Sequence, residues 1–312
     1  MVAKRNMHRV LSSDFPDADP DDVATWRPPL EALKIEFRRH ADRVFQNKKR
    51  TGSSRIGRRL YIFLAGHGIT PARAASPNFE DAALLMATAS AYAYGEHLLG
   101  YSWAEWFINA AAFDEVLLFM DCCRDVKNNV PPIPCSLTPL LDDRRAEVKV
   151  FCAVATELDS LSWEQDFGTP AQPHGVFSYV LMQGLRSAGL RNAAGDLTGT
   201  RLASFLDHEL PKLRADQRPR LKSDITRDIV ITRQRPTDAP NVEVEFSPAV
   251  SGQDVELFAS DNLDVPIHSH RVDGVAWQLR LPRGLYKLTA PQSESLLVEV
   301  SGTSEVSHVT YP

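Results

Sequence analysis

Residues 60–68 read LYIFLAGHG, and residues 116–124 read VLLFMDCCR. Each stretch begins with a short apolar run and ends in polar or reactive residues, Gly-His-Gly in the first and Asp-Cys-Cys in the second. A third, largely apolar run follows at residues 148–155. Apolar runs of this length, separated by helical patterns, predict a parallel sheet covered by helices on both faces. Reacting groups in such sheets lie at the carboxyl ends of the strands, where both motifs fall.

The spacing of apolar residues predicts the helices that cover this sheet. The predicted helices are residues 30–47, 103–112, 175–187 and 199–213. Residues 82–89 are apolar enough for a buried strand or a short helix, and residues 8–13 are the only candidate for a strand before the first helix. We therefore expect residues 1–235 to form one α/β domain.

The sequence pattern changes near residue 241. Apolar and polar residues alternate in short segments, most clearly at Val275, Trp277, Leu279 and Leu281. Short alternating strands separated by turns predict a small β-sandwich for residues 241–312, joined to the first domain by a linker at residues 233–240.

Composition and charge favour a soluble globular protein: 43% of the residues are hydrophobic, 24% are charged, and the net charge is −5. Residues 241–312 hold 10 acidic and 4 basic residues, a balance that disfavours nucleic-acid binding there. No apolar run is long enough to cross a bilayer, and the first residues lack the apolar core of a signal peptide. We expect a cytoplasmic protein with neither a nucleic-acid nor a membrane partner.

The four cysteines are Cys122, Cys123, Cys135 and Cys152. They are too few for a disulfide framework, and no Cys-x-x-Cys pair suggests zinc, so we expect no metal or other cofactor. Side chains alternate along a strand, which places Asp121 and Cys123 on one side and Cys122 on the other. If Cys123 faces a cleft, Cys122 packs into the interior.

A carboxylate beside a nucleophilic thiol opposes formation of the thiolate, so the position of Asp121 needs a reason. The simplest is recognition of a basic substrate side chain; the alternative is a strand-end turn residue.

His67 lies between two glycines, where a substrate backbone can approach closely, and Gly68 can present its N–H to a carbonyl oxygen. The N–H of Cys123 is a candidate second donor.

Together these motifs resemble the caspase superfamily, and most closely its metacaspase branch and the prokaryotic caspase-like domains. His67 and Cys123 are 56 positions apart, close to the roughly 50 expected between the family's histidine and cysteine. The resemblance extends over about residues 60–232. It includes residues 153–164, like the family's specificity loop, and the segments HGVFSY (174–179), GDLT (195–198) and QRPR (217–220). Two departures are that Arg124-Asp125 replaces the His-Ser-Gly usual in metacaspases, and that a first strand is not evident.

The resemblance implies a caspase-like three-layer αβα sandwich and a cysteine endopeptidase. It assigns Cys123 as nucleophile, His67 as proton donor to the leaving amine, and the N–H groups of Gly68 and Cys123 as oxyanion hole. Asp121 takes the position that lines the primary specificity pocket, which implies cleavage after Arg or Lys. Peptides or proteins are then the substrates.

Several alternatives remain open. A catalytically inactive caspase-like scaffold is the main competitor, and thiol redox sensing through the adjacent cysteines is a third reading. Arg144 and Arg145 are either self-cleavage points or part of a solvated charge run. His174, which precedes a predicted helix, is expected to be a loop or cap residue. For the C-terminal module we expect a regulatory role, with a small-molecule or protein activator, as in bacterial cell-death or antiphage effectors.

Overall fold

The computed structural model divides the chain into two compact units. It describes residues 7–11, 19, 26–71, 82–89, 94, 96–167, 173–187, 189–192, 194–223, 228–233, 240–259, 263–281, 284–291, 293–300 and 306–312. The first unit comprises Met1–Ser178 and Asp207–Ile229, and the second comprises Tyr179–Leu206 and Val230–Pro312. Helices α3 (Val176–Arg186) and α4 (Gly199–Leu213) contribute residues to both units.

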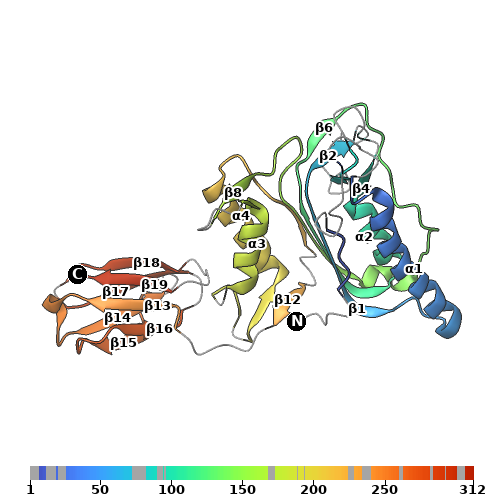
Figure 1. Cartoon of the computed structure of the whole chain (residues 1–312). Helices are drawn as coiled ribbons and strands as arrows, with labels where there is room; N and C mark the ends of the chain where they lie inside the picture. The colour runs from blue at the N-terminus through green and yellow to red at the C-terminus, as the bar shows by residue number, and fades with distance from the viewer. Residues whose placement is uncertain are drawn as a thin grey trace. The chain divides into compact units, whose positions relative to one another are not determined.

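A mostly parallel four-stranded sheet forms the centre of the first unit (Figure 1), with the strand order β1–β5–β7–β11. Its strands are β1 (Gly57–Ala65), β5 (Phe113–Asp121), β7 (Lys149–Val154) and β11 (Arg220–Ser223). The first three run parallel, and β11 joins β7 in the antiparallel direction. The prediction of a mixed α/β protein with a parallel sheet built from three apolar runs is confirmed.

Helices α1 (Leu30–Thr51) and α2 (Gly100–Asn109) flank this sheet and share one hydrophobic core with it. Trp103 and Trp106 are 1% and 6% exposed, so both tryptophans of α2 belong to the core. Alternate strand residues pack into the same core: Ile62, Leu64, Val116, Leu118, Met120, Cys152 and Val154. The residues of β5 that face the other way, Leu117 and Phe119, are also buried, which explains why β5 is apolar from Val116 to Met120.

A second sheet, with the strand order β4–β3–β2–β6, includes the segments that follow the carboxyl ends of β1 and β5. Its strands are β2 (Gly68–Pro71), β3 (Ala83–Leu85), β4 (His97–Leu99) and β6 (Asp125–Lys127). Strands β2 and β6 are parallel, and the other pairs are antiparallel. A short antiparallel pair, β8 (Glu164–Asp166) and β9 (Pro173–Gly175), precedes α3. The apolar pattern predicts none of these elements except the strand within residues 82–89.

In the second unit, β10 (Asp196–Thr198) pairs antiparallel with β12 (Val230–Arg233). Residues 240–312 add two sheets, β16–β13–β19 and β15–β14–β17–β18. Their strands are β13 (Val242–Phe246), β14 (Asp254–Ala259), β15 (His268–Arg271), β16 (Trp277–Leu279), β17 (Gly284–Thr289), β18 (Leu296–Val300) and β19 (Ser307–Tyr311). All pairs are antiparallel except β13 with β19, and one hydrophobic core contains residues of both sheets.

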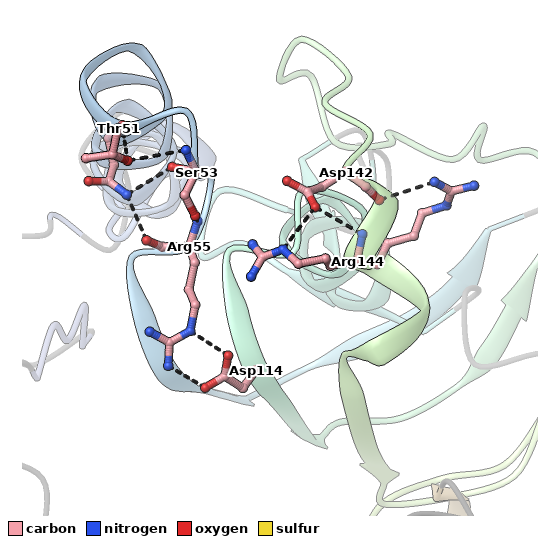
Figure 2. Close-up of polar contacts among 8 residues, drawn as sticks. Thr51, Ser53, Arg55, Asp114, Asp142 and Arg144 are labelled. Atoms are coloured by element: carbon pink, nitrogen blue, oxygen red, sulfur yellow. Dashed lines mark hydrogen bonds and ion pairs between the residues drawn. The ribbon is translucent and has the colours of Figure 1, made fainter.

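Local polar contacts stabilise the end of the central sheet at which β1 and β5 begin (Figure 2). Arg55 Nε donates to Asp114 Oδ1 at 2.6 Å, which ties the segment before β1 to the start of β5. The Asn47 side chain donates to the carbonyls of Ser53 and Arg55, both at 2.9 Å, and fixes the turn that follows α1. Asp142 accepts from Arg144 N–H at 3.0 Å at the start of the 3₁₀ helix η5 (Asp143–Glu147). A second 3₁₀ helix, η6, spans Pro248–Val250 in the C-terminal part of the chain.

The predicted element bounds are close for α4 and less so elsewhere. The strand predicted at residues 275–281 is shorter, because the Asn241 side chain bonds the N–H and carbonyl of Leu281, each at 2.8 Å, in place of a strand partner. Of the candidate first strand at residues 8–13, residues 8–11 are not a strand, and residues 12 and 13 lie outside the described residues. None of the helices in the described part of the chain combines the length and apolar character needed to span a bilayer.

Candidate active site

The strand register places His67 and Cys123 at the same level on neighbouring segments. Strand β1 pairs with β5 up to Ala65 opposite Asp121, and β2 pairs with β6 from Ile69 opposite Asp125. Partner numbers differ by 56 in both ladders, and His67 and Cys123, also 56 apart, lie in the interval between them. Neighbouring strands are about 4.8 Å apart, so this register brings the two residues side by side. His67 is exposed and Cys123 is half-buried, so both can reach a ligand.

Gly68 lies close to the cysteine segment. A Cβ at this position would lie 2.5 Å from the Cys123 carbonyl oxygen and 2.6 Å from Cys122 Cβ, so only glycine fits. Leu85 N–H donates to the His67 carbonyl at 2.8 Å, which makes the pair Gly68 and Leu84 a non-hydrogen-bonded one. The N–H of Gly68 therefore points away from β3, toward the side of β2 on which the cysteine segment lies. The oxyanion-hole role of Gly68 stays a prediction.

The sulfur of Cys123 contacts the backbone of Ser162, which lies in the loop between β7 and β8. Ser162 N–H donates to Cys123 Sγ at 3.3 Å, and Sγ lies 3.6 Å from the Ser162 carbonyl oxygen, to which the thiol donates. An N–H donor to sulfur stabilises the thiolate, which is the nucleophilic form of cysteine. Ser162 is part of the segment 153–164 that the sequence singles out, but its contact with Cys123 could not be read from the sequence.

Cys122 has different surroundings. It is 1% exposed and packs in the core shared with α1 and α2, as strand alternation predicts. Burial raises the pKa of the Cys122 thiol far above its usual range, and the neighbouring Asp121 raises it further. Cys122 thus stays a neutral thiol, and Cys123 is the only member of the pair that ligands can reach.

Asp121 is a buried carboxylate, 7% exposed, that accepts hydrogen bonds from two serines. Its Oδ1 accepts from Ser162 Oγ at 2.9 Å, and its Oδ2 accepts from the N–H and Oγ of Ser178 at 3.1 Å and 2.5 Å. Ser178 lies in the first turn of α3, whose N–H groups have no partner within the helix. A Cβ at Gly175 would lie 2.2 Å from Asp121 Oδ2, so the approach of the chain to the carboxylate also requires glycine.

No cation balances the charge of Asp121 within the described residues, where none of the ion pairs includes it. The α3 amide and the two hydroxyls contribute only partial charges. An isolated buried carboxylate is costly unless it is paired, so this position favours a cationic ligand. The same contacts are also those of a structural carboxylate that caps α3. The alternative that the sequence leaves open is a strand-end turn residue.

The segment that follows Cys123 is fixed by backbone hydrogen bonds. Arg124 is fully buried; its N–H donates to the Ser160 carbonyl at 3.0 Å, and its carbonyl accepts from Asp159 N–H at 3.0 Å. The hydroxyl of Thr70 on β2 also donates to this carbonyl, at 3.2 Å. Arg124 thus lies inside the protein, between β2 and the Asp159–Ser160 loop, although it is next to half-buried Cys123 in the sequence.

The two candidate self-cleavage positions lie apart from this cluster. Arg144 and Arg145 belong to η5 beside the start of β7, whereas Cys123 follows the end of the neighbouring parallel strand β5, so they lie at opposite ends of the sheet. Since β5 spans nine residues at about 3.3 Å each, that end is roughly 25–30 Å away. A pocket of about 460 Å³ at this end is lined by α1 side chains with Arg55 and Ile56 and holds no nucleophile. His174 is exposed in β9, in the short segment that precedes α3.

Among the described residues, no group of three or more His, Cys, Asp or Glu side chains is arranged to hold a metal ion. The four cysteines are free thiols. The polar groups that gather at the strand ends are instead an imidazole, a thiol, a carboxylate and backbone N–H groups. These are groups that can perform acyl transfer without a metal.

Comparisons with known proteins add little to this geometry. A scan against models of protein families matches none of them, and a search of curated proteins finds no significant match. One similar solved structure is protein GSU0716 from Geobacter sulfurreducens, a structural genomics target, at 14% identity and a TM-score of 0.36. The match covers 70% of this chain and 94% of that chain. A likeness this distant carries no argument about function.

Proposed function

We propose that this chain is a cysteine endopeptidase of the caspase/metacaspase type that cleaves peptide bonds after Arg or Lys. The single observation that carries the proposal is the common level of exposed His67 and half-buried Cys123, next to the buried carboxylate of Asp121. Thiol, imidazole and amide donors at adjacent strand ends are the parts that acyl transfer through a thioester needs.

In the proposed reaction, the Cys123 thiolate attacks the main-chain carbonyl carbon of the basic residue. The N–H groups of Gly68 and Cys123 hold the negative charge that develops on the carbonyl oxygen. The C–N bond then breaks as protonated His67 gives its proton to the leaving amine, which leaves a thioester on Cys123. Water hydrolyses the thioester to a carboxylic acid and restores the thiol.

Substrate preference in this proposal comes from Asp121. A basic side chain that enters beside Cys123 would supply the cation that Asp121 lacks among the described residues, and the Ser162 and Ser178 hydroxyls can turn to accommodate it. The proposal includes the finer fold, a three-layer αβα caspase-like domain with a C-terminal β-sandwich. Burial of Leu117 and Phe119 opposite the α1–α2 core supports a second helical layer.

Hydrolysis of short reporter peptides that end in Arg, Lys, Gln or Asp tests the proposal. We expect the Arg and Lys reporters to be cleaved, and we expect Cys123→Ala and His67→Ala variants to lose that activity. Preferential cleavage of the Asp reporter would overturn the assignment of Asp121.

The scaffold alternative has one observation in its favour: the three hydrogen bonds to Asp121 also suit a purely structural carboxylate that caps α3. A scaffold would keep its cellular effect in the Cys123→Ala variant, whereas a peptidase would lose it.

For the C-terminal sheets we propose a regulatory role in which a small molecule or a partner protein controls the peptidase, in an effector of bacterial cell death or antiphage defence. The motivation is that unregulated proteolysis inside a cell is toxic. A truncation after residue 240 keeps β12, which pairs with β10, and removes only the two terminal sheets. If cleavage rate, stability and response to stimulus all stay the same, these sheets are not the regulator.

A further inference from the structure

Gln217 is a fully buried amide that joins three parts of the chain near the candidate active site. It follows α4 and precedes β11. Its Nε2 donates to the Ala155 carbonyl and to Ser162 Oγ, both at 3.2 Å, and its Oε1 accepts from Trp163 N–H at 3.1 Å. Both amide hydrogens and the amide oxygen are therefore used, which fixes the orientation of the side chain.

The same turn holds Trp163 by two further contacts. Asp216 Oδ2 accepts from the indole N–H at 3.0 Å, and the Arg214 guanidinium lies 5.1 Å from the centre of the ring. A cation over an aromatic face is attracted to it. Residues 214–217 therefore contact both the backbone N–H and the indole ring of Trp163. The neighbouring Ser162 is thereby held from one side.

Ser162 carries these constraints to the reactive groups. Its hydroxyl accepts from Gln217, so its single proton is directed to Asp121 Oδ1, and its N–H is directed to Cys123 Sγ. The chain of donors thus has one direction, from the amide of Gln217 through Ser162 to the carboxylate. A change at Gln217 is expected to reach both the thiol and the carboxylate although it touches neither.

We propose that Gln217 is a positioning residue for the active site: through Ser162 it sets the reactivity of the Cys123 thiol and the orientation of Asp121. The part that concerns substrate preference rests on the proposed peptidase function. The part that concerns the thiol does not, because reactivity toward an alkylating reagent requires no turnover.

Two substitutions separate the contributions of Gln217. Gln217→Met keeps the length of the side chain and removes all three hydrogen bonds. Gln217→Glu keeps an acceptor for Trp163 N–H but cannot donate to Ser162 Oγ, whose proton then turns from Asp121 to the new carboxylate. Gln165→Met is the matched control, because Gln165 lies in β8 and its side chain makes no hydrogen bond within the described residues.

The experiment measures the rate at which iodoacetamide alkylates Cys123 in the full-length chain, by mass spectrometry of the peptide, from pH 6 to pH 10. At pH 7 we expect both Gln217 variants to react about tenfold more slowly than the parent. Gln217→Met no longer holds Ser162 N–H against Sγ, and Gln217→Glu leaves Asp121 without the Ser162 proton and adds a second carboxylate that opposes the thiolate. The deficit should narrow toward pH 10, because a high concentration of hydroxide favours the reactive thiolate whatever hydrogen bonds the sulfur accepts. Gln165→Met should match the parent, and the Arg-to-Gln reporter preference should fall in both Gln217 variants.

Each outcome has a distinct meaning. Unchanged alkylation in Gln217→Glu, folded by circular dichroism, overturns the inference, whatever the peptidase assay gives; this variant decides if Gln217→Met fails to fold. A deficit that persists equally at pH 10 also overturns it, because that pattern indicates blocked access to the sulfur. Slower alkylation in a chain that cleaves no reporter supports the positioning role and refutes the peptidase.

Discussion

Replacement of Asp121 by asparagine is the most informative perturbation of substrate preference. The two side chains have nearly the same shape, and the asparagine can still accept the Ser178 hydrogen bonds through its remaining oxygen. The substitution removes one negative charge from a site that is 7% exposed and has no cation in contact with it among the described residues. A preference for basic substrates that depends on this charge must then be lost.

The expected size of the effect follows from the charge pair that a basic substrate would form with Asp121. Two unit charges 4 Å apart interact by about 4 kcal/mol at an effective dielectric constant of 20, and breaking a buried pair costs about 3–5 kcal/mol. Since about 1.4 kcal/mol corresponds to a factor of ten, kcat/KM for an Arg reporter should fall by roughly a thousandfold. A reporter that ends in Gln gains nothing from the charge and should change by less than about fivefold.

The assay compares kcat/KM for Arg, Lys and Gln reporters in the parent and in Asp121→Asn, with the thermal unfolding midpoint measured in parallel. An equal loss for all three reporters would mean that Asp121 holds α3 and the Ser162 loop in place and does not select the substrate. An Arg preference that survives the substitution would refute the reasoning outright.

Three further predictions follow from the geometry. Cys123→Ala should abolish hydrolysis, whereas Cys122→Ala should keep at least a third of the activity and lower the free energy of unfolding by about 1 kcal/mol, measured by denaturant titration. Gly175→Ala should destabilise the protein by about 1–3 kcal/mol in the same assay, because its Cβ would lie 2.2 Å from the Asp121 carboxylate; an unchanged midpoint would contradict this. Burial, with nearby basic groups, lowers the pKa of His40 from 6.5 to about 4. The unfolded chain then binds a proton that the folded chain does not, so His40 should make stability fall as the pH drops from about 6.5 to 4, and urea titrations should find a shallower fall in His40→Gln.

The sequence predicts best those helices and strands whose order of apolar and polar residues directly reflects which residues are buried. Strand β5 lies in the middle of the sheet and is buried on both faces, so it reads as one apolar run. Helix α4 has the predicted bounds because a clear helical period fills the whole segment from Gly199 to Leu213. Alternation along the strand end was enough to separate Cys122 from Cys123, since it depends on backbone geometry alone.

The parts that escaped prediction depend on contacts between distant residues. Strands β2 and β6 have only four and three residues, too few for a period to be recognised, yet their pairing sets the level of His67 and Cys123. Ser162 and Gln217 are 55 positions apart, and no local sequence pattern predicts that the Gln217 amide will donate a hydrogen bond to the Ser162 hydroxyl. The sequence could thus name candidate site residues but not the contacts that orient them.

The central claim is that His67 and Cys123 form a dyad beside a carboxylate that selects basic residues. Labelling with chloromethyl ketone peptides that end in Arg or in Asp, followed by peptide mapping, tests it most directly. We predict that the Arg probe modifies Cys123 and spares Cys122, and that it reacts at least tenfold more slowly in His67→Ala and in Asp121→Asn. Labelling of Cys122, equal labelling by the Asp probe, or an intact Cys123 after exposure to the Arg probe would contradict the account.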